Sequence, residues 1–557
     1  MMTRFIPVSG LAWCLVALQP LSAQTPAPPA PAAEIPSLDA EQWREDLRFM
    51  VAEMERRHAN LYHSVSREAF AAAVADLHAR IPVLQRNQII VGMMRIAAMV
   101  GDGHTRVDPR KDDKFGFPSL PLKLYLFEDG LYVRAAAPQH AALVGSRVDA
   151  IGGVPVAEAM RRAAEIASRD NEIGPKLFIP LYLAMPDILH ALRLSDSRDA
   201  ASLTLSRNRR TWTVKVAAGQ VDPRWPPDTD ISLVTPQGWV DARTTPQPPV
   251  WLQAPLESHR LIELPERGGL YAQLNMVTDT KDQSLARFGA RIHERAQALN
   301  PRAVILDLRL NLGGNGYLRN SLVRQLIRTE DEDTRLFVLT ARGTFSASQF
   351  ILDDLDRLSN AVFVGEPASS KPSSFGDAYR MPMPNSGISV RSSIYYWQEG
   401  QNRDPYTWVD VAAPLTFPDY AAGRDPAVEA ALAYVQPRPL REQLLAAQEA
   451  GGVEAVRAAV RAYWSDPVKR YANRTLHLLQ TAEALNQSGA GESALAMAQM
   501  VAEWEPRSVD AANVAAHLAH RNNRIDLARD WLKRVLELDP NHRLARTLLE
   551  QLDQPTK

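Results

Sequence analysis

Cysteine is almost absent from this chain, because one residue, Cys14, occurs among 557. A surplus of charge of one sign is absent too: 63 basic and 64 acidic residues give a formal net charge of −1. A near-neutral chain gives no reason to expect nucleic acid or an anionic membrane surface as a partner. The 12 histidines include no His-Glu-x-x-His string, so the sequence predicts neither a metal site nor a cofactor. Small molecules, peptides and proteins remain as candidate partners.

The N-terminus predicts export. A positively charged start is followed by an apolar run over residues 11–18 and by a small-residue cleavage site that ends at Ala23, the pattern of a secretory signal peptide. The run is too short to span a membrane, and no later stretch reaches that length. Cleavage would remove Cys14, so the mature protein could form no disulfide. We therefore expect a periplasmic or secreted protein without an integral membrane span.

The stretch 335–371 carries the strongest catalytic signal. It predicts a strand, a serine turn, a helix, a second strand and a lysine loop, because Leu336–Leu339 is continuously apolar and apolar residues recur at helical spacing from Ser346 to Asn360. Ser346 is thus expected at a helix N-terminus, where unpaired N–H groups and the helix dipole would stabilise an oxyanion. A simpler interpretation stays open, since serine is a favoured N-cap.

Ser346-Ala-Ser-Gln349, Gly365-Glu-Pro367 and Lys371 together resemble the nucleophile region of the tail-specific, or C-terminal-processing, serine proteases and their tricorn-type relatives. Lys371 follows Ser346 by 371 − 346 = 25 residues, which is similar to the spacing of the family's Ser/Lys dyad. The resemblance implies an α/β protease core of stacked strand-helix units, similar to the crotonase and Clp folds. It also implies an acyl-enzyme on Ser346.

Two bases are candidates for that serine. Lys371 could act if burial or a nearby cation left it neutral. The other is His104, in the Gly-Asp-Gly-His-Thr turn over residues 101–105; this string resembles a family signature whose histidine, in the tricorn-type branch, works with the serine. The unshifted pKa of a histidine already suits neutral pH, and a carboxylate would hold its tautomer. Asp404 and Asp410 are the candidates for that carboxylate.

The oxyanion hole is expected where a buried strand ends at Asp307-Leu-Arg309 and is followed by a Gly-Gly turn. Such a turn lets backbone amides approach a bound group closely. The family resemblance implies one donor here and one from the residue after the nucleophile, which predicts Gly313 or Gly314 together with Ala347. Asp307 and Arg309 are interpreted as a structural ion pair or turn clamp.

Two further modules resemble known domains. Strands and a helix over residues 119–222 resemble a PDZ-like module, which can add a peptide to a sheet edge; a packed subdomain without a groove is the alternative. After residue 436 the chain predicts helices, and Pro506 and Pro540 lie 540 − 506 = 34 residues apart, the tetratricopeptide period. Such repeats offer a concave surface to a protein partner, although simple helical capping is also possible.

These patterns predict a multidomain α/β protein. Its expected parts are a signal peptide (1–23), a Pro/Ala-rich linker (24–37), an N-terminal helical cap (38–118), the PDZ-like module (119–222), the catalytic core (223–435) and the helical repeats (436–557).

The favoured function is an exported serine endopeptidase that acts on peptide or protein substrates. A catalytically silent relative that binds peptides or proteins is the alternative. Three departures from the family pattern favour it: Gln349 replaces an acid, Phe375 replaces a glutamine that supports the lysine, and Ala368 replaces a threonine. A serine esterase or amidase is the third possibility. The sequence predicts no oligomeric state.

Overall fold

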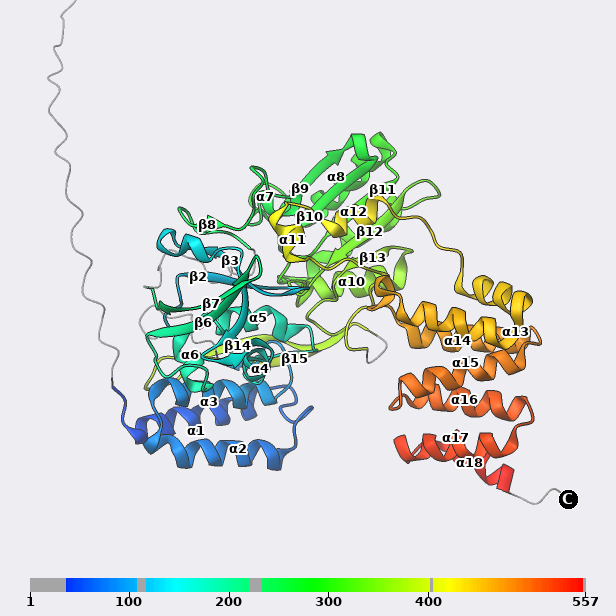
Figure 1. Cartoon of the computed structure of the whole chain (residues 1–557), viewed down its shortest axis with the longest axis horizontal. Helices are drawn as coiled ribbons and strands as arrows, with labels where there is room; N and C mark the ends of the chain where they lie inside the picture. Colours follow the sequence, from blue (N-terminus) through cyan, green and yellow to red (C-terminus); the bar gives the residue numbers. More distant parts are fainter. Residues whose placement is uncertain (1–36, 108–116, 220–232, 401–403, 554–557) are drawn as a thin grey trace, which may run out of the picture. The chain divides into compact units, whose positions relative to one another are not determined.

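The computed structural model describes residues 37–107, 117–219, 233–400 and 404–553. The predicted signal peptide and nearly all of the predicted linker lie outside these residues. The described residues form a mixed α/β structure with three sheets, shown in Figure 1. In these ranges no helix combines the length and the apolar character that crossing a bilayer requires.

The helical region that follows the linker has local start signals. Asp39 closes a capping box on the first helix, and the Ser66 side chain accepts the Ala69 N–H at the start of the second. The three helices are α1 (Ala40–Arg57), α2 (Arg67–Arg80) and α3 (Arg86–Met99). Their apolar faces belong to a hydrophobic core that continues into the next region of the chain, across the boundary predicted at residue 118.

That next region is an antiparallel sheet with the strand order β2-β3-β4-β6-β7, in which β5 pairs with β4 and β8 with β3. The strands are β2 (Leu122–Phe127), β3 (Gly130–Ala136), β4 (Arg147–Ile151), β5 (Val154–Pro155), β6 (Ala200–Arg207), β7 (Arg210–Ala217) and β8 (Val240–Asp241). The helices are α4 (Val156–Ala164), α5 (Gly174–Tyr182) and α6 (Pro186–Ala191). The strands and the helix after Val156 agree with the sequence pattern; the PDZ-like character of this region stays a prediction.

The second sheet has the order β16-β13-β12-β11-β10-β9 and is parallel except for β9. Its strands are β9 (His259–Leu264), β10 (Gly269–Leu274), β11 (Ala303–Asp307), β12 (Arg335–Thr340), β13 (Val362–Gly365) and β16 (Val411–Ala412). Every residue of β10, β11 and β13 is buried. Helices cover both faces of a parallel sheet, so its strands are buried on both sides. This burial explains the continuous apolar runs in the sequence.

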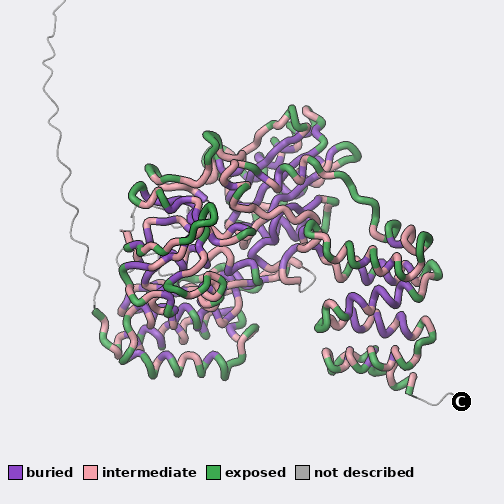
Figure 2. Tube along the Cα trace, viewed as in Figure 1, coloured by how far each residue is buried: buried purple, intermediate pink, exposed green. Residues whose placement is uncertain are grey.

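Successive side chains of each strand point to opposite faces of this sheet. Val304 and Leu306 pack with the first group of helices, whereas Ile305 packs with the second. The first group is α8 (Leu285–Leu299), α9 (Arg319–Thr329) and α10 (Ala347–Leu358), and the second is α7 (Val250–Gln253), α11 (Phe417–Ala421) and α12 (Pro426–Leu432). Figure 2 shows that buried residues follow the central strands. The crotonase- or Clp-like stacking of these units stays a prediction.

A long hairpin was not predicted from the sequence. Strands β14 (Ser373–Pro382) and β15 (Ser389–Gln398) pair antiparallel, and β15 also pairs with β1 (Arg106–Val107). In this sheet β15 lies between β1 and β14, so the hairpin that follows Lys371 is joined to the chain after His104.

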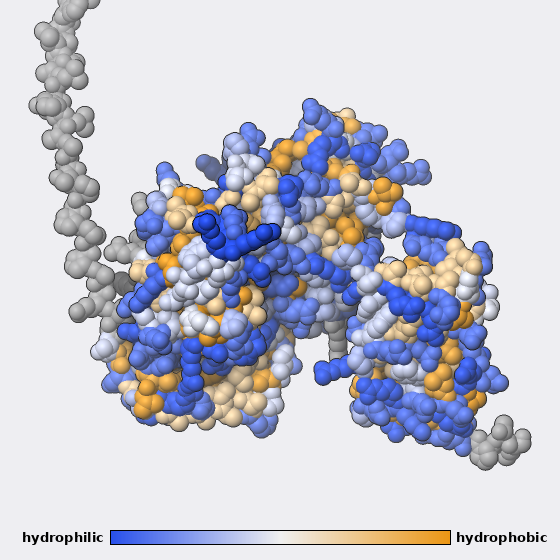
Figure 3. Space-filling view, in the orientation of Figure 1, coloured by the Kyte–Doolittle hydropathy of each residue, from blue (hydrophilic) through white to orange (hydrophobic). Residues whose placement is uncertain are grey.

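The C-terminal region is helical, as predicted. It contains α13 (Leu440–Ser465), α14 (Arg474–Gln487), α15 (Gly491–Trp504), α16 (Val509–Arg521), α17 (Ile525–Leu538) and α18 (Arg543–Asp553). The pairs α14–α15 and α16–α17 share buried apolar faces. In the face drawn in Figure 3, hydrophilic residues alternate with smaller hydrophobic patches. Assignment of these helices as tetratricopeptide repeats stays a prediction.

Candidate active site

Ser346 stands between β12 and α10, at the N-cap position of the helix. Its hydroxyl does not cap the helix; instead, Oγ lies 3.1 Å from Nε2 of His104. The backbone of Ser346 has φ 59° and ψ −126°, a conformation that side chains with a Cβ rarely adopt and that costs about 1–3 kcal/mol. Such strain persists only where the surrounding structure imposes it. The surroundings of Ser346 therefore direct its hydroxyl to His104, whereas the hydroxyl of an ordinary N-cap serine would bond to the helix N–H groups.

The turn that carries His104 is built around the Asp102 carboxylate, which is buried. Asp102 Oδ1 accepts the N–H groups of His104 (2.8 Å) and Thr105 (2.7 Å) and the hydroxyl of Ser393 (2.8 Å), and Oδ2 lies 2.9 Å from His58 Nε2. Burial alone would raise the pKa of Asp102, but the bonds from His58, Thr105 and Ser393 lower it to about 2. A permanently charged acceptor therefore holds the backbone of His104.

The described residues contain one set of three potential metal ligands, namely His58, His63 and Asp102. The hydrogen bonds of His58 make it a poor ligand. Its Nδ1 accepts the Asn60 N–H at 3.0 Å, so in the neutral ring Nε2 carries the proton and donates it to Asp102. A metal would need the lone pair of that same Nε2. The arrangement fits a histidine–carboxylate hydrogen bond that supports the His104 turn better than it fits a metal centre.

The His104 ring is enclosed. It stacks on Phe345 with ring centroids 4.4 Å apart, and burial lowers its pKa to about 4 against the raising effect of Asp102. At neutral pH the ring is uncharged and can accept a proton. Its Nδ1 is buried, and a hydrogen bond between the ring and the Phe375 backbone also raises the pKa. Of the two predicted orienting acids, Asp410 accepts the Phe363 N–H at 2.9 Å; an orienting role for Asp404 or Asp410 stays a prediction.

Two backbone amides near Ser346 lack partners among the described residues: those of Ala347, in the first turn of α10, and of Gly314. The Gly313 N–H is committed to Asn311 Oδ1 at 2.9 Å, which leaves Gly314 with Ala347 as the available pair of the predicted alternatives. The turn lies against the nucleophile, because a Cβ added to Gly313 would lie 2.7 Å from the Ser346 Cβ. Gly314 has φ 140°, and a Cβ there would meet the Val277 carbonyl oxygen at 2.2 Å.

Lys371 is the lysine of the predicted Ser/Lys dyad. No hydrogen bond or ion pair links it to another residue in the described parts of the chain, and it lines a pocket of about 530 Å³ with His63, Asp170, Phe375 and others. Its neighbour contacts the nucleophile instead, because the Ser346 N–H donates to Ser370 Oγ at 2.9 Å. In this geometry Ser370, and not Lys371, contacts Ser346; the Ser/Lys dyad stays a prediction.

Gln349 and Phe375, two residues that depart from the family pattern, both contact neighbouring side chains. Gln349 is buried in α10 and donates to Asp353 Oδ1 (2.7 Å) and Thr407 Oγ1 (2.6 Å). The Phe375 ring lies 4.3 Å from that of His63, so it helps to pack the histidine that lies beside the pocket. The Gln349 N–H donates to the Ser346 carbonyl at 2.8 Å in the first turn of α10, while its side chain bonds to Asp353 and Thr407. Neither departure argues against a reactive serine.

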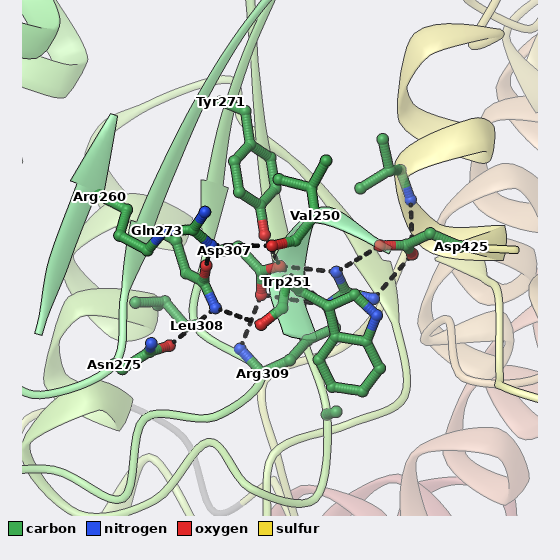
Figure 4. A network of polar contacts seen from close by, with 12 residues as sticks. Val250, Trp251, Arg260, Tyr271, Gln273, Asn275, Asp307, Leu308, Arg309 and Asp425 are labelled. Atoms are coloured by element: carbon green, nitrogen blue, oxygen red, sulfur yellow. Dashed lines mark hydrogen bonds and ion pairs between the residues drawn. The ribbon is translucent and has the colours of Figure 1, made fainter. Parts of the chain in front are cut away.

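Below the glycine turn lies the polar network of Figure 4. Arg309 binds Asp307 at the end of β11 (2.6 Å) and Asp425 at the start of α12 (2.8 Å), and its guanidinium lies 4.4 Å from the Trp251 ring. The predicted ion pair between Asp307 and Arg309 is confirmed. All three charged groups are buried, so the network fixes the chain just before the Gly-Gly turn.

Sequence reasoning missed three buried polar residues next to this site: Asp170, Asn171 and Ser370. Asp170 and Asn171 lie between α4 and α5, in the region predicted to be PDZ-like. No motif or spacing links them to Ser346, and only the folded chain brings them there.

No protein-family model and no curated protein matches this sequence. Three solved structures to which it is similar are mature CPAF, the photosystem II D1 C-terminal processing protease and the tricorn protease. The identities are 13%, 14% and 13%, and the TM-scores are 0.45, 0.32 and 0.33. The alignments cover 69%, 67% and 71% of this chain and 94%, 93% and 36% of the others. These values assign neither a fold family nor an activity to this chain, so the functional conclusion depends on the geometry of the site.

Proposed function

We propose that this chain is an exported serine peptidase of the tricorn-type branch of the tail-specific proteases, with Ser346 as nucleophile and His104 as general base. The observation that carries the proposal is the 3.1 Å separation of Ser346 Oγ and His104 Nε2. A serine needs a neighbouring base to become a useful nucleophile, and this distance is within hydrogen-bond reach.

The first half of the reaction forms an acyl-enzyme. Ser346 Oγ attacks the carbonyl carbon of a peptide bond and its proton passes to Nε2 of His104. The carbonyl oxygen becomes an oxyanion, which the N–H groups of Gly314 and Ala347 can receive. His104 then gives the proton to the leaving amine as the C–N bond breaks.

The second half regenerates the serine. A water molecule attacks the acyl carbon and loses its proton to His104, and the C–O bond to Ser346 breaks as that proton returns to Oγ. The low pKa of His104 keeps the imidazole neutral and able to accept a proton at physiological pH, and the nearby Asp102 charge favours the imidazolium that forms transiently.

Peptide or protein substrates are proposed from the family resemblance of the sequence, and a protein partner on the C-terminal helices from the repeat pattern. Lys371 is not assigned as the base, because the residue beside it, Ser370, holds the nucleophile.

The test is the intact mass of the purified protein after exposure to a serine-reactive fluorophosphonate. We expect one adduct on wild type, none on Ser346→Ala, and labelling at least about 100-fold slower for His104→Gln. Lys371→Met, the matched control, should retain most of the rate. If Lys371→Met abolishes labelling and His104→Gln does not, lysine is the base.

Activity against a peptide panel and simple esters separates the reaction classes. Cleavage of peptides supports a peptidase, and hydrolysis of esters alone supports the esterase or amidase alternative. Folded wild type that forms no adduct between pH 5 and 9 contradicts the enzyme proposal and favours a binding protein.

A further inference from the structure

The short segment between α4 and α5 contacts both sides of the turn that carries His104. Ser168 Oγ donates to the Thr105 carbonyl at 2.6 Å, and the Gly103 N–H donates to Asp170 Oδ1 at 2.8 Å. Gly103 and Thr105 are the two chain neighbours of His104, so this segment fixes the histidine backbone from a different region of the fold.

The same segment also holds the chain next to the nucleophile. Asn171 Nδ2 donates to the carbonyls of Ala368 (3.0 Å), Ser370 (3.2 Å) and Pro405 (2.9 Å). Ser370 in turn receives the Ser346 N–H on its hydroxyl. Two neighbouring side chains, Asp170 and Asn171, thus link the histidine turn to the serine turn, although these turns are 346 − 104 = 242 residues apart.

The hydrogen bond between Asp170 and Gly103 does not require an ionisable side chain. Asp170 is 6% exposed, and its carboxyl faces both the Gly103 N–H and the Ser370 hydroxyl, the same hydroxyl that receives the Ser346 N–H. An asparagine could accept the Gly103 N–H equally well without placing an ionisable group beside the buried Asp102. Burial of a carboxyl is costly, and the bond of Asp170 to Gly103, the residue before His104, points to a role for its charge.

We propose that Asp170 is a positioning residue for the His104–Ser346 pair. It holds the His104 turn through Gly103, and its negative charge favours the imidazolium that forms on His104 during attack. This inference rests on the proposed function, in which His104 is the base.

The charge of Asp170 changes in the neutral range. Burial and the Asp102 carboxylate raise its pKa to about 7, with the Gly103 N–H, Lys371 and the Ser370 hydroxyl opposing the shift. The other titratable groups that line the same pocket are His63, whose pKa burial lowers from 6.5, Tyr396 and Asp404. As pH rises through about 7, Asp170 loses its proton and the stabilisation of the imidazolium appears.

The experiment measures the second-order rate of fluorophosphonate labelling from pH 5 to 9. Wild type should show a rise of at least about fivefold centred near pH 7. Asp170→Asn, which keeps an acceptor for Gly103, should label at the wild-type rate within about threefold at pH 5.5 and lose the rise. Asp170→Ala should lose at least about tenfold at every pH while unfolding at a similar temperature, because it also removes the acceptor.

Glu172→Gln is the matched control, because Glu172 is exposed in the same segment; its profile should equal that of wild type. His63→Gln should keep the rise, which separates Asp170 from the neighbouring histidine. A wild-type profile in Asp170→Asn, or an Asp170→Ala rate that falls only with the folded fraction, overturns the inference.

A second measurement does not depend on reactivity. In protein labelled with ¹³C-histidine, the His104 Cε1–H resonance should show an inflection near pH 7 that disappears in Asp170→Asn. If wild type forms no adduct but this inflection is present and lost in the variant, the proposed function fails and the coupling of Asp170 to His104 stands. If no inflection is present in wild type, the coupling is refuted.

Discussion

Asp353 should lower the free energy of unfolding of the core as pH rises. It lies two turns into α10, is 8% exposed, and accepts from Gln349 Nε2 (2.7 Å) and Thr407 Oγ1 (3.2 Å). Burial raises its pKa from 3.8 to about 8, although these two hydrogen bonds oppose the shift. The folded-state pKa is thus above the unfolded value, so the contribution of Asp353 to stability is full below pH 3.8 and is lost as pH rises through about 8.

The size of the loss follows from the shift. About four pH units correspond to roughly 6 kcal/mol of unfolding free energy at full ionisation. Asp353→Asn keeps the shape of the side chain and cannot ionise. It should therefore have a stability close to that of wild type at pH 4.5 and exceed it by several kcal/mol at pH 9.

Urea unfolding followed by tryptophan fluorescence at pH 4.5, 7 and 9 would measure this difference. The variant's midpoint should move upward relative to wild type at each step. Asp333→Asn, at an exposed position, changes net charge equally and should alter the midpoint less than Asp353→Asn at pH 9. A difference between Asp353→Asn and wild type that stays constant from pH 4.5 to 9 would refute the assignment of a buried carboxyl that folds in its protonated form.

Three other substitutions test the site and its support. Ser346→Gly should abolish labelling yet raise the unfolding temperature relative to Ser346→Ala, because glycine relieves a φ of 59° worth about 1–3 kcal/mol; calorimetry of both variants measures this. Arg309→Met should lower stability by about 3–5 kcal/mol, since Asp307 and Asp425 would remain buried without their cation, and urea midpoints report it. Asp102→Asn should slow labelling at least about tenfold, because one of its two acceptor atoms becomes a donor that opposes the donors around it.

The elements around the nucleophile were predictable because their signals are local. The apolar run Leu336–Leu339 lies inside β12, and the helical spacing after Ser346 gave α10, which ends at Leu358, two residues before the expected end at Asn360. Strand and helix periods are set by residues a few positions apart. The same holds for the glycine turn and for the helices of the C-terminal region.

The β14–β15 hairpin was missed for the opposite reason. Its sequence lacks a continuous alternation, since only the first part of β14 is mostly buried, and Asp377 interrupts the strand with φ 52°. Its pairing with β1 joins Arg106 to Arg391, which no local pattern encodes. This pairing nevertheless places the chain after His104 beside β15, the second strand of the hairpin that follows Lys371.

The choice of base shows where reasoning from spacing fails. The sequence separation of 25 residues from Ser346 indicated the segment that contacts the nucleophile. Adjacent side chains in a non-helical segment point in different directions, however, and it is Ser370, not Lys371, that contacts Ser346. His104 was predicted from a turn motif alone, with no sequence spacing that linked it to the serine. Its role depends on Asp102 inside the turn, which the motif contains, and on Asp170, which it does not. The segment between α4 and α5 can be recognised only in the folded structure, where residues 104, 170 and 346 lie close together. Its side chains bond mainly to backbone groups, and a backbone partner leaves no signature in the sequence.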